Sequence, residues 1–179
     1  MCDFVTATLD PRADVERVRE VFESHGRALT PLAGSPIAAA LGAAGRYFLT
    51  LGGGACDCGT PLGAARLKDR GDVTKELEKR RRQGWSAAKL ARWLEQRTKA
   101  VPPPQSEQLD RWRQLVTSAV EVGGARTVGL SLHTYRGRVD TEDFPVARER
   151  LPIQACTLEF LADMRRDTLY EFTAPQQRS

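Results

Sequence analysis

The chain has 179 residues, which is the size of one ordinary domain and is long enough to bury a core. With 41% hydrophobic and 28% charged residues and no run of 18 apolar residues, it is neither a disordered chain nor a predicted membrane span. The net charge of +4 is too small to indicate a partner unless the cations cluster. We expect a cytoplasmic protein, because residues 1–4 lack the basic region and apolar run of a signal peptide.

The first half of the chain predicts two strands and an intervening helix. Residues 2–9 are rich in β-branched and aromatic side chains, and Asp10-Pro11 ends this strand. Asp14 caps a helix with apolar residues at helical spacing, and Gly26 ends it. Ser35-Pro36 begins a short Ala-rich helical turn in the otherwise unclear segment 28–45. The apolar run Tyr47–Leu51 is the second strand, and glycines follow it directly.

The second half predicts a helical hairpin, a long helix, a strand, a short helix and a closing strand. The hairpin begins at about Asp72, Gly84 interrupts it, Ser86 caps its second helix, and the prolines at 102–104 form a linker after it. The long helix begins at Ser106 and carries a wide apolar face. The segment 126–135 alternates as a strand with one buried side, which puts His133 on the less apolar side. Thr157 caps the short helix, and residues 168–173 are the closing strand.

This order of elements predicts an α+β fold. We expect a small mixed or antiparallel sheet of about four strands, layered with helices, with an inserted basic helical hairpin. Residues 1–173 form a single globular domain in this prediction, residues 66–104 are the insertion with its Pro-rich linker, and residues 174–179 are a flexible tail.

The best candidate site is a cysteine motif. Cys56 and Cys58 form a C-x-C pair in a glycine-rich loop directly after the strand 47–51. Thiolates are good zinc ligands, and a structural zinc ion takes four sulfur or nitrogen donors. If strands 2–9 and 47–51 pair antiparallel, Cys2 lies near the C-x-C pair. We therefore predict a zinc site on Cys56 and Cys58, completed from Cys2, Cys156, His133 and His25.

Two other interpretations of the same cysteines stay open. One is a dithiol redox protein, in which the two thiols separated by one residue close a strained and therefore labile disulfide. Alternatively, the cysteines are buried small apolar residues that only pack. The C-x-C pair favours a functional site, whereas for Cys2 and Cys156 packing alone is the stronger interpretation. The position of Cys156 before a helix start would also suit a separate nucleophile.

The basic hairpin carries a second hypothesis, that of a non-enzymatic binding module. Residues 76–95 resemble the opening two helices of a helix-turn-helix DNA reader, although prolines stand where a third helix is required. This interpretation has the hairpin engage nucleic acid or an acidic protein partner through Lys79, Arg80, Arg81, Arg82, Lys89 and Arg92. Acidic residues interleaved with these cations favour an ordinary solvated helix face instead.

The sequence contains no complete catalytic signature. Only two histidines are present, and neither lies in a recognisable nucleophile motif. The glycines at 52–59 match neither a dinucleotide-binding nor a P-loop pattern. The sequence alone therefore leaves open whether the protein is an enzyme.

Overall fold

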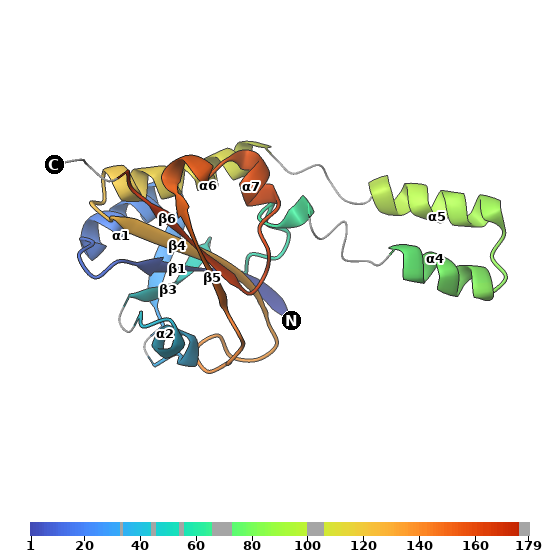
Figure 1. Ribbon diagram of the computed structural model, residues 1–179, viewed down its shortest axis with the longest axis horizontal. Helices are drawn as coiled ribbons and strands as arrows, with labels where there is room; N and C mark the ends of the chain where they lie inside the picture. The colour runs from blue at the N-terminus through green and yellow to red at the C-terminus, as the bar shows by residue number, and fades with distance from the viewer. Residues whose placement is uncertain (33, 44–45, 54–55, 66–72, 100–105, 176–179) are drawn as a thin grey trace.

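The computed structural model describes residues 1–32, 34–43, 46–53, 56–65, 73–99 and 106–175. The fold is mixed α/β, with one six-stranded mixed sheet in the order β2-β3-β1-β4-β6-β5 (Figure 1). The strands are β1 (Cys2–Leu9), β2 (Arg27–Pro31), β3 (Tyr47–Gly52), β4 (Thr127–Tyr135), β5 (Ala147–Pro152) and β6 (Thr168–Thr173). The helices are α1 (Val15–Ser24), α2 (Pro36–Ala40), α4 (Val73–Arg82), α5 (Ala87–Lys99), α6 (Ser106–Glu121) and α7 (Leu158–Ala162), and a short 3₁₀ turn spans Ile153–Ala155.

Strand β1 lies in the middle of the sheet and pairs antiparallel with β3 on one side and β4 on the other. Beyond Thr50, β3 stays paired with β2 as far as Gly52, whereas the pairing of β1 with β3 runs from Thr8 opposite Tyr47 to Val5 opposite Thr50. This is the antiparallel pairing expected from the sequence. It places the start of β1 beside the loop that follows β3.

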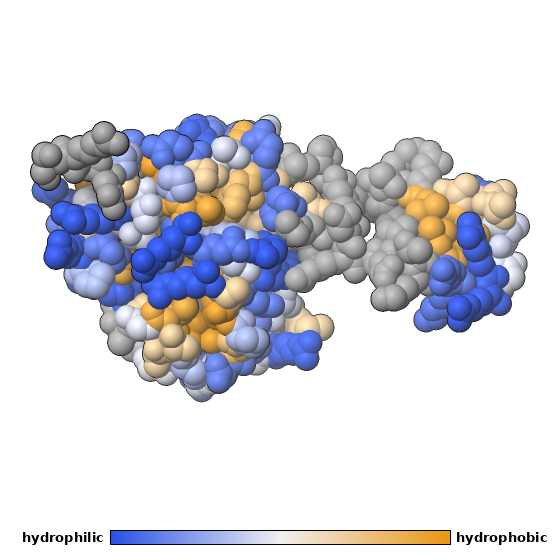
Figure 2. Space-filling model, viewed as in Figure 1, coloured by the Kyte–Doolittle hydropathy of each residue, from blue (hydrophilic) through white to orange (hydrophobic). Residues whose placement is uncertain are grey.

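Each face of the sheet is covered by its own apolar cluster. Helices α1, α6 and α7 lie over one face (Figure 1), where the main core includes Phe22, Leu115 and Leu132. Helix α2 covers part of the other face with a smaller cluster that includes Ile37 and Tyr47. Some members of this smaller cluster are only partly buried, and hydrophobic side chains reach the surface in the region of α2 (Figure 2). The sheet is thus a middle layer with apolar residues packed on both of its faces.

The expectation of about four strands is wrong, because the sheet also contains the two edge strands β2 and β5. Both are edge strands, and most of their side chains are intermediate or exposed. Such strands show no apolar alternation in sequence, and β5 carries three charged residues within Ala147–Pro152. The parallel pairing of β5 with β6 makes the sheet mixed.

The prediction that β4 has only one buried side is also wrong. Ser131, His133 and Tyr135 are buried, as are the apolar residues that alternate with them. The second apolar cluster explains this, since Phe144 from the segment after β4 stacks on the His133 ring. Polar residues of a strand can therefore face a second core layer rather than water.

The basic segment forms the two helices α4 and α5, which contact one another. Arg80 of α4 lies over the rings of Trp85 and Trp93, at 4.5 and 4.3 Å from the ring centroids. The role of this pair as an inserted unit stays a prediction. The predicted Pro-rich linker at 102–104 and the tail residues 176–179 lie outside the described residues. Within the described part of the chain, no helix is both long and apolar enough to cross a membrane.

Gly63 fixes the loop that follows the C-x-C motif against α7. Its N–H donates to Leu161 O at 2.9 Å, its φ is +65°, and an added Cβ would lie 2.6 Å from Met164 O. We expect Gly63→Ala to lower the free energy of unfolding by about 2–3 kcal/mol, because left-handed backbone strain adds to a backbone clash.

Gly124 is the matched control for this change, since its φ is +66° and an added Cβ would meet nothing within 4 Å. Gly124→Ala isolates the backbone strain and should cost about 1 kcal/mol. Urea denaturation of both variants measures the difference. Equal losses at the two positions would contradict the close packing of Gly63 against Met164.

Candidate metal centre

Three cysteines meet at one end of the sheet. The sulfur atoms of Cys2, Cys56 and Cys58 all lie within 4.8 Å of one another. Sulfurs around a tetrahedral zinc ion lie about 3.8 Å apart when each zinc–sulfur bond is about 2.3 Å. Closing the cluster around an ion therefore requires shifts of at most about 1 Å, which side-chain rotation supplies.

The strand register explains why these residues meet. Cys2 begins β1, and the loop after β3 returns to run beside the first residues of that strand. The N–H of Asp57 donates to Asp3 O at 2.7 Å, which extends the pairing of β1 beyond the end of β3. The N–H of Asp3 in turn donates to Cys58 Sγ at 3.3 Å. An N–H aimed at a sulfur stabilises the thiolate, which is the form that binds metal.

Asp57 anchors the loop from the position between the two motif cysteines. Its side chain is only 5% exposed, and its Oδ2 accepts the Val5 N–H at 2.8 Å. Its other oxygen forms an ion pair with Arg27 of β2. The guanidinium of Arg27 lies 4.2 Å from the ring centroid of Trp112 on α6. Burial raises the pKa of Asp57, and the charge of Arg27 opposes that rise.

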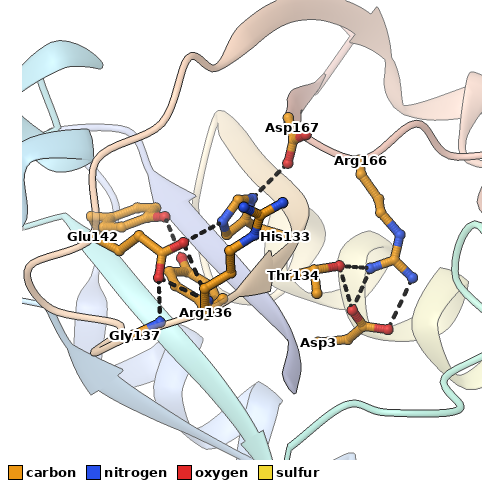
Figure 3. A network of polar contacts seen from close by, with 10 residues as sticks. Asp3, His133, Thr134, Arg136, Gly137, Glu142, Arg166 and Asp167 are labelled. Atoms are coloured by element: carbon orange, nitrogen blue, oxygen red, sulfur yellow. Dashed lines mark hydrogen bonds and ion pairs between the residues drawn. The ribbon is translucent and has the colours of Figure 1, made fainter. Parts of the chain in front are cut away.

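Asp3 holds the other side of the cluster. Its carboxylate forms an ion pair with Arg166 and accepts the Thr134 hydroxyl at 2.7 Å (Figure 3). Arg166 comes from the segment before β6, so the ion pair ties the start of β1 to β4 and β6. Sequence reasoning missed Asp3, Asp57 and their arginine partners. The sequence does carry a signal for both acids, because Asp57 lies between the two motif cysteines and Asp3 follows Cys2.

His133 does not join the cysteine cluster. Its Nδ1 lies 2.6 Å from Asp167 Oδ1, and its Nε2 lies 3.4 Å from Glu142 Oε1 (Figure 3). Its ring is stacked on Phe144 with centroids 3.4 Å apart. Glu142 also accepts the N–H groups of Arg136 and Gly137, and these hydrogen bonds lower the pKa of Glu142. The histidine thereby links the segment after β4 to the turn before β6.

The other two candidate donors are not among the three clustered sulfurs, although His25 lines the same cavity as Cys56 and Cys58. Cys156 is buried in the main core, and this burial raises the pKa of its thiol to about 12. A thiol with such a pKa is a poor nucleophile and a poor ligand at neutral pH. His25 follows α1, and its Nδ1 lies 2.9 Å from Val21 O.

The two motif thiols have different acidities. Hydrogen bonds from the backbone and side chain of Cys58 lower the pKa of Cys56. For Cys58, the Asp3 N–H lowers the pKa, but the hydrogen bond to Cys56, burial and the neighbouring sulfurs outweigh it, so the pKa is raised. Cys56 is therefore the first of the pair to ionise. One thiolate is thus available at a lower pH than an ordinary cysteine provides.

We expect three of the four cysteines to be reactive in the folded protein and the buried Cys156 to be unreactive. In metal-free protein, we expect Cys2, Cys56 and Cys58 to react with a chromogenic disulfide reagent, and Cys156 to react only after unfolding. Mass spectrometry after brief alkylation at falling pH should show Cys56 reacting at lower pH than Cys58, because its pKa is lowered. Four thiols that react only in denaturant would contradict an accessible cluster.

The six cations proposed to bind nucleic acid or an acidic protein lie on α4 and α5. Arg80 is held by the two tryptophans and by an ion pair with Glu76 at 3.4 Å. Lys79 and Arg82 line a surface hollow with Glu78 and Gln83. Contact with a partner through this surface stays a prediction.

The chain was compared with protein-family models, curated proteins and solved structures, and nothing in the three comparisons matches it.

Proposed function

We propose that the protein binds a zinc ion through the thiolates of Cys2, Cys56 and Cys58. The observation that carries this proposal is the meeting of three sulfurs from two separate segments within 4.8 Å. Zinc prefers such soft donors and accepts a site with three protein ligands and one open position.

A dithiol redox function explains fewer of these contacts. A disulfide needs only two thiols, whereas Cys2 is brought to the pair from a different strand. The Asp3 N–H that points at Cys58 Sγ is the kind of outer contact that orients a metal ligand. The ion pairs of Asp3 and Asp57 fix both segments from outside the cluster, which matches the support that metal sites require.

Metal analysis of protein purified without chelator or a metal-binding tag tests the proposal. We expect about one equivalent of zinc, and about one equivalent again after removal and re-addition of the metal. Less than about a tenth of an equivalent under both conditions overturns the zinc proposal.

Comparing protein isolated without reductant with the same protein after reduction is the matched control for the redox alternative. A redox dithiol would hold a disulfide in protein isolated without reductant, and its zinc content would stay near zero after reduction. The zinc site would instead show three thiols that become unreactive when zinc is added. Mass spectrometry distinguishes the two results, because a disulfide lowers the mass by two hydrogens.

A further inference from the structure

A cavity of about 430 Å³ opens beside the motif cysteines. The loop that carries Cys56 and Cys58 forms one part of its lining, and a face of α6 forms another. Gln108, Arg111 and Trp112 share that face because they are spaced three and four residues apart. The volume is in the range of small-molecule sites.

The cavity gives access to one position of the proposed zinc ion. Zinc takes four ligands, and among the described residues the cluster of close donors has three members. Cys56 and Cys58 line this cavity, while Cys2 lines a separate hollow. A fourth ligand from solution would therefore approach through the cavity.

The cavity walls also favour an anionic group. Among the described residues that line the cavity, Asp57 is the acidic one. Its carboxylate forms an ion pair with Arg27 and accepts the Val5 N–H. Arg111 lines the cavity and pairs with Glu107, and both side chains are exposed, with an N–O distance of 2.6 Å. An exposed pair of this kind contributes little, so a ligand carboxylate can replace Glu107. Arginine binds carboxylates well because its two N–H groups match the two oxygens.

We propose that this cavity binds a small thiol that also carries a carboxylate, with the sulfur on the zinc ion and the carboxylate on Arg111. This inference rests on the proposed zinc site. A thiolate is the donor that matches the three already present, and the guanidinium of Arg111 in the same cavity selects the anionic end. Binding is reversible coordination, in which the thiol proton is released to solvent and the sulfur replaces a water molecule on the metal.

Cobalt-substituted full-length protein tests the inference, because cobalt–thiolate bonds absorb in the near ultraviolet. The three ligands to compare are 3-mercaptopropionate, 2-mercaptoethanol and propionate. We expect both thiols to raise the absorption and propionate to leave it unchanged. Half-saturation should require about 2- to 5-fold less 3-mercaptopropionate than 2-mercaptoethanol, since a contact to an exposed arginine is worth about 0.5–1 kcal/mol.

Arg111→Gln should remove this preference, so that the two thiols bind with affinities within about 1.5-fold of one another. Arg113→Gln is the matched control on the same helix, because Arg113 pairs with Asp110 and is not among the residues that line the cavity. It should keep the full preference. Equal affinity of the two thiols in the unmodified protein, or an unchanged preference in the Arg111 variant, overturns the inference.

The two proposals fail in different ways in this experiment. If cobalt gives no thiolate absorption before any ligand is added, the metal site itself is wrong. If that absorption is present and neither thiol increases it, the metal site stands and the ligand proposal is wrong.

Discussion

Replacing Cys56 by Ser is expected to weaken zinc binding by more than about 100-fold. Loss of an outer contact to a metal ligand costs about 10–100-fold, and loss of the ligand itself costs more. A serine hydroxyl stays protonated at neutral pH and cannot replace the thiolate. The change is local, because Cys56 is only partly buried. Competition with a chromogenic zinc chelator measures the affinity.

Cys156→Ala is the matched control for this variant. Cys156 is buried in the main core and is not one of the three clustered residues, so its loss should lower stability slightly and leave zinc affinity unchanged. Equal zinc affinity in Cys56→Ser and the unmodified protein would show that the ion binds elsewhere. A large loss of affinity in Cys156→Ala would place a ligand in the core instead.

Asp57→Ala should lower the free energy of unfolding of the metal-free protein by about 3 kcal/mol. The Asp57 side chain is 5% exposed and that of Arg27 is 15% exposed, so the variant leaves a largely buried guanidinium without its partner. The Val5 N–H also loses its acceptor, and Arg27 Nε already lacks one among the described residues. Zinc affinity should fall about 10–100-fold, because the loop that holds both motif cysteines is released.

Asp57→Asn separates the two contributions. Its amide oxygen still accepts the Val5 N–H, but its NH2 group takes the place of the oxygen that accepts from Arg27, so the charge and the hydrogen bond to Arg27 are lost together while the Val5 contact is kept. We expect a smaller loss of stability than in the alanine variant, measured by urea denaturation with and without zinc. If Asp57→Ala stays within about 0.5 kcal/mol of the unmodified protein, Asp57 does not anchor the loop.

The approach of Cys2 to the C-x-C loop could be predicted from the sequence, because it depends on the pairing of two neighbouring strands. The strands 2–9 and 47–51 have clear patterns, and their antiparallel pairing places Cys2 beside the C-x-C loop. Glycines after β3 allow the sharp turn that this return requires.

The contacts that support the site could not be predicted, because they join residues far apart in sequence. Arg27 belongs to the edge strand β2, which lacks an apolar alternation, and it meets Asp57 only after β2 pairs with β3. His133 likewise depends on Phe144 and Glu142 from a segment without regular structure. The second core layer that buries the far face of β4 is built from short apolar runs, and these leave a weak pattern in sequence.

X-ray absorption spectroscopy of the zinc-loaded protein tests the central claim most directly. The claim predicts three sulfur neighbours at about 2.3 Å and one lighter oxygen or nitrogen neighbour at about 2.0 Å. Cys56→Ser, loaded with excess zinc, should lose one sulfur from this shell. A shell of oxygen and nitrogen atoms alone, or one that is identical in Cys56→Ser, would contradict the proposal that Cys2, Cys56 and Cys58 bind the metal.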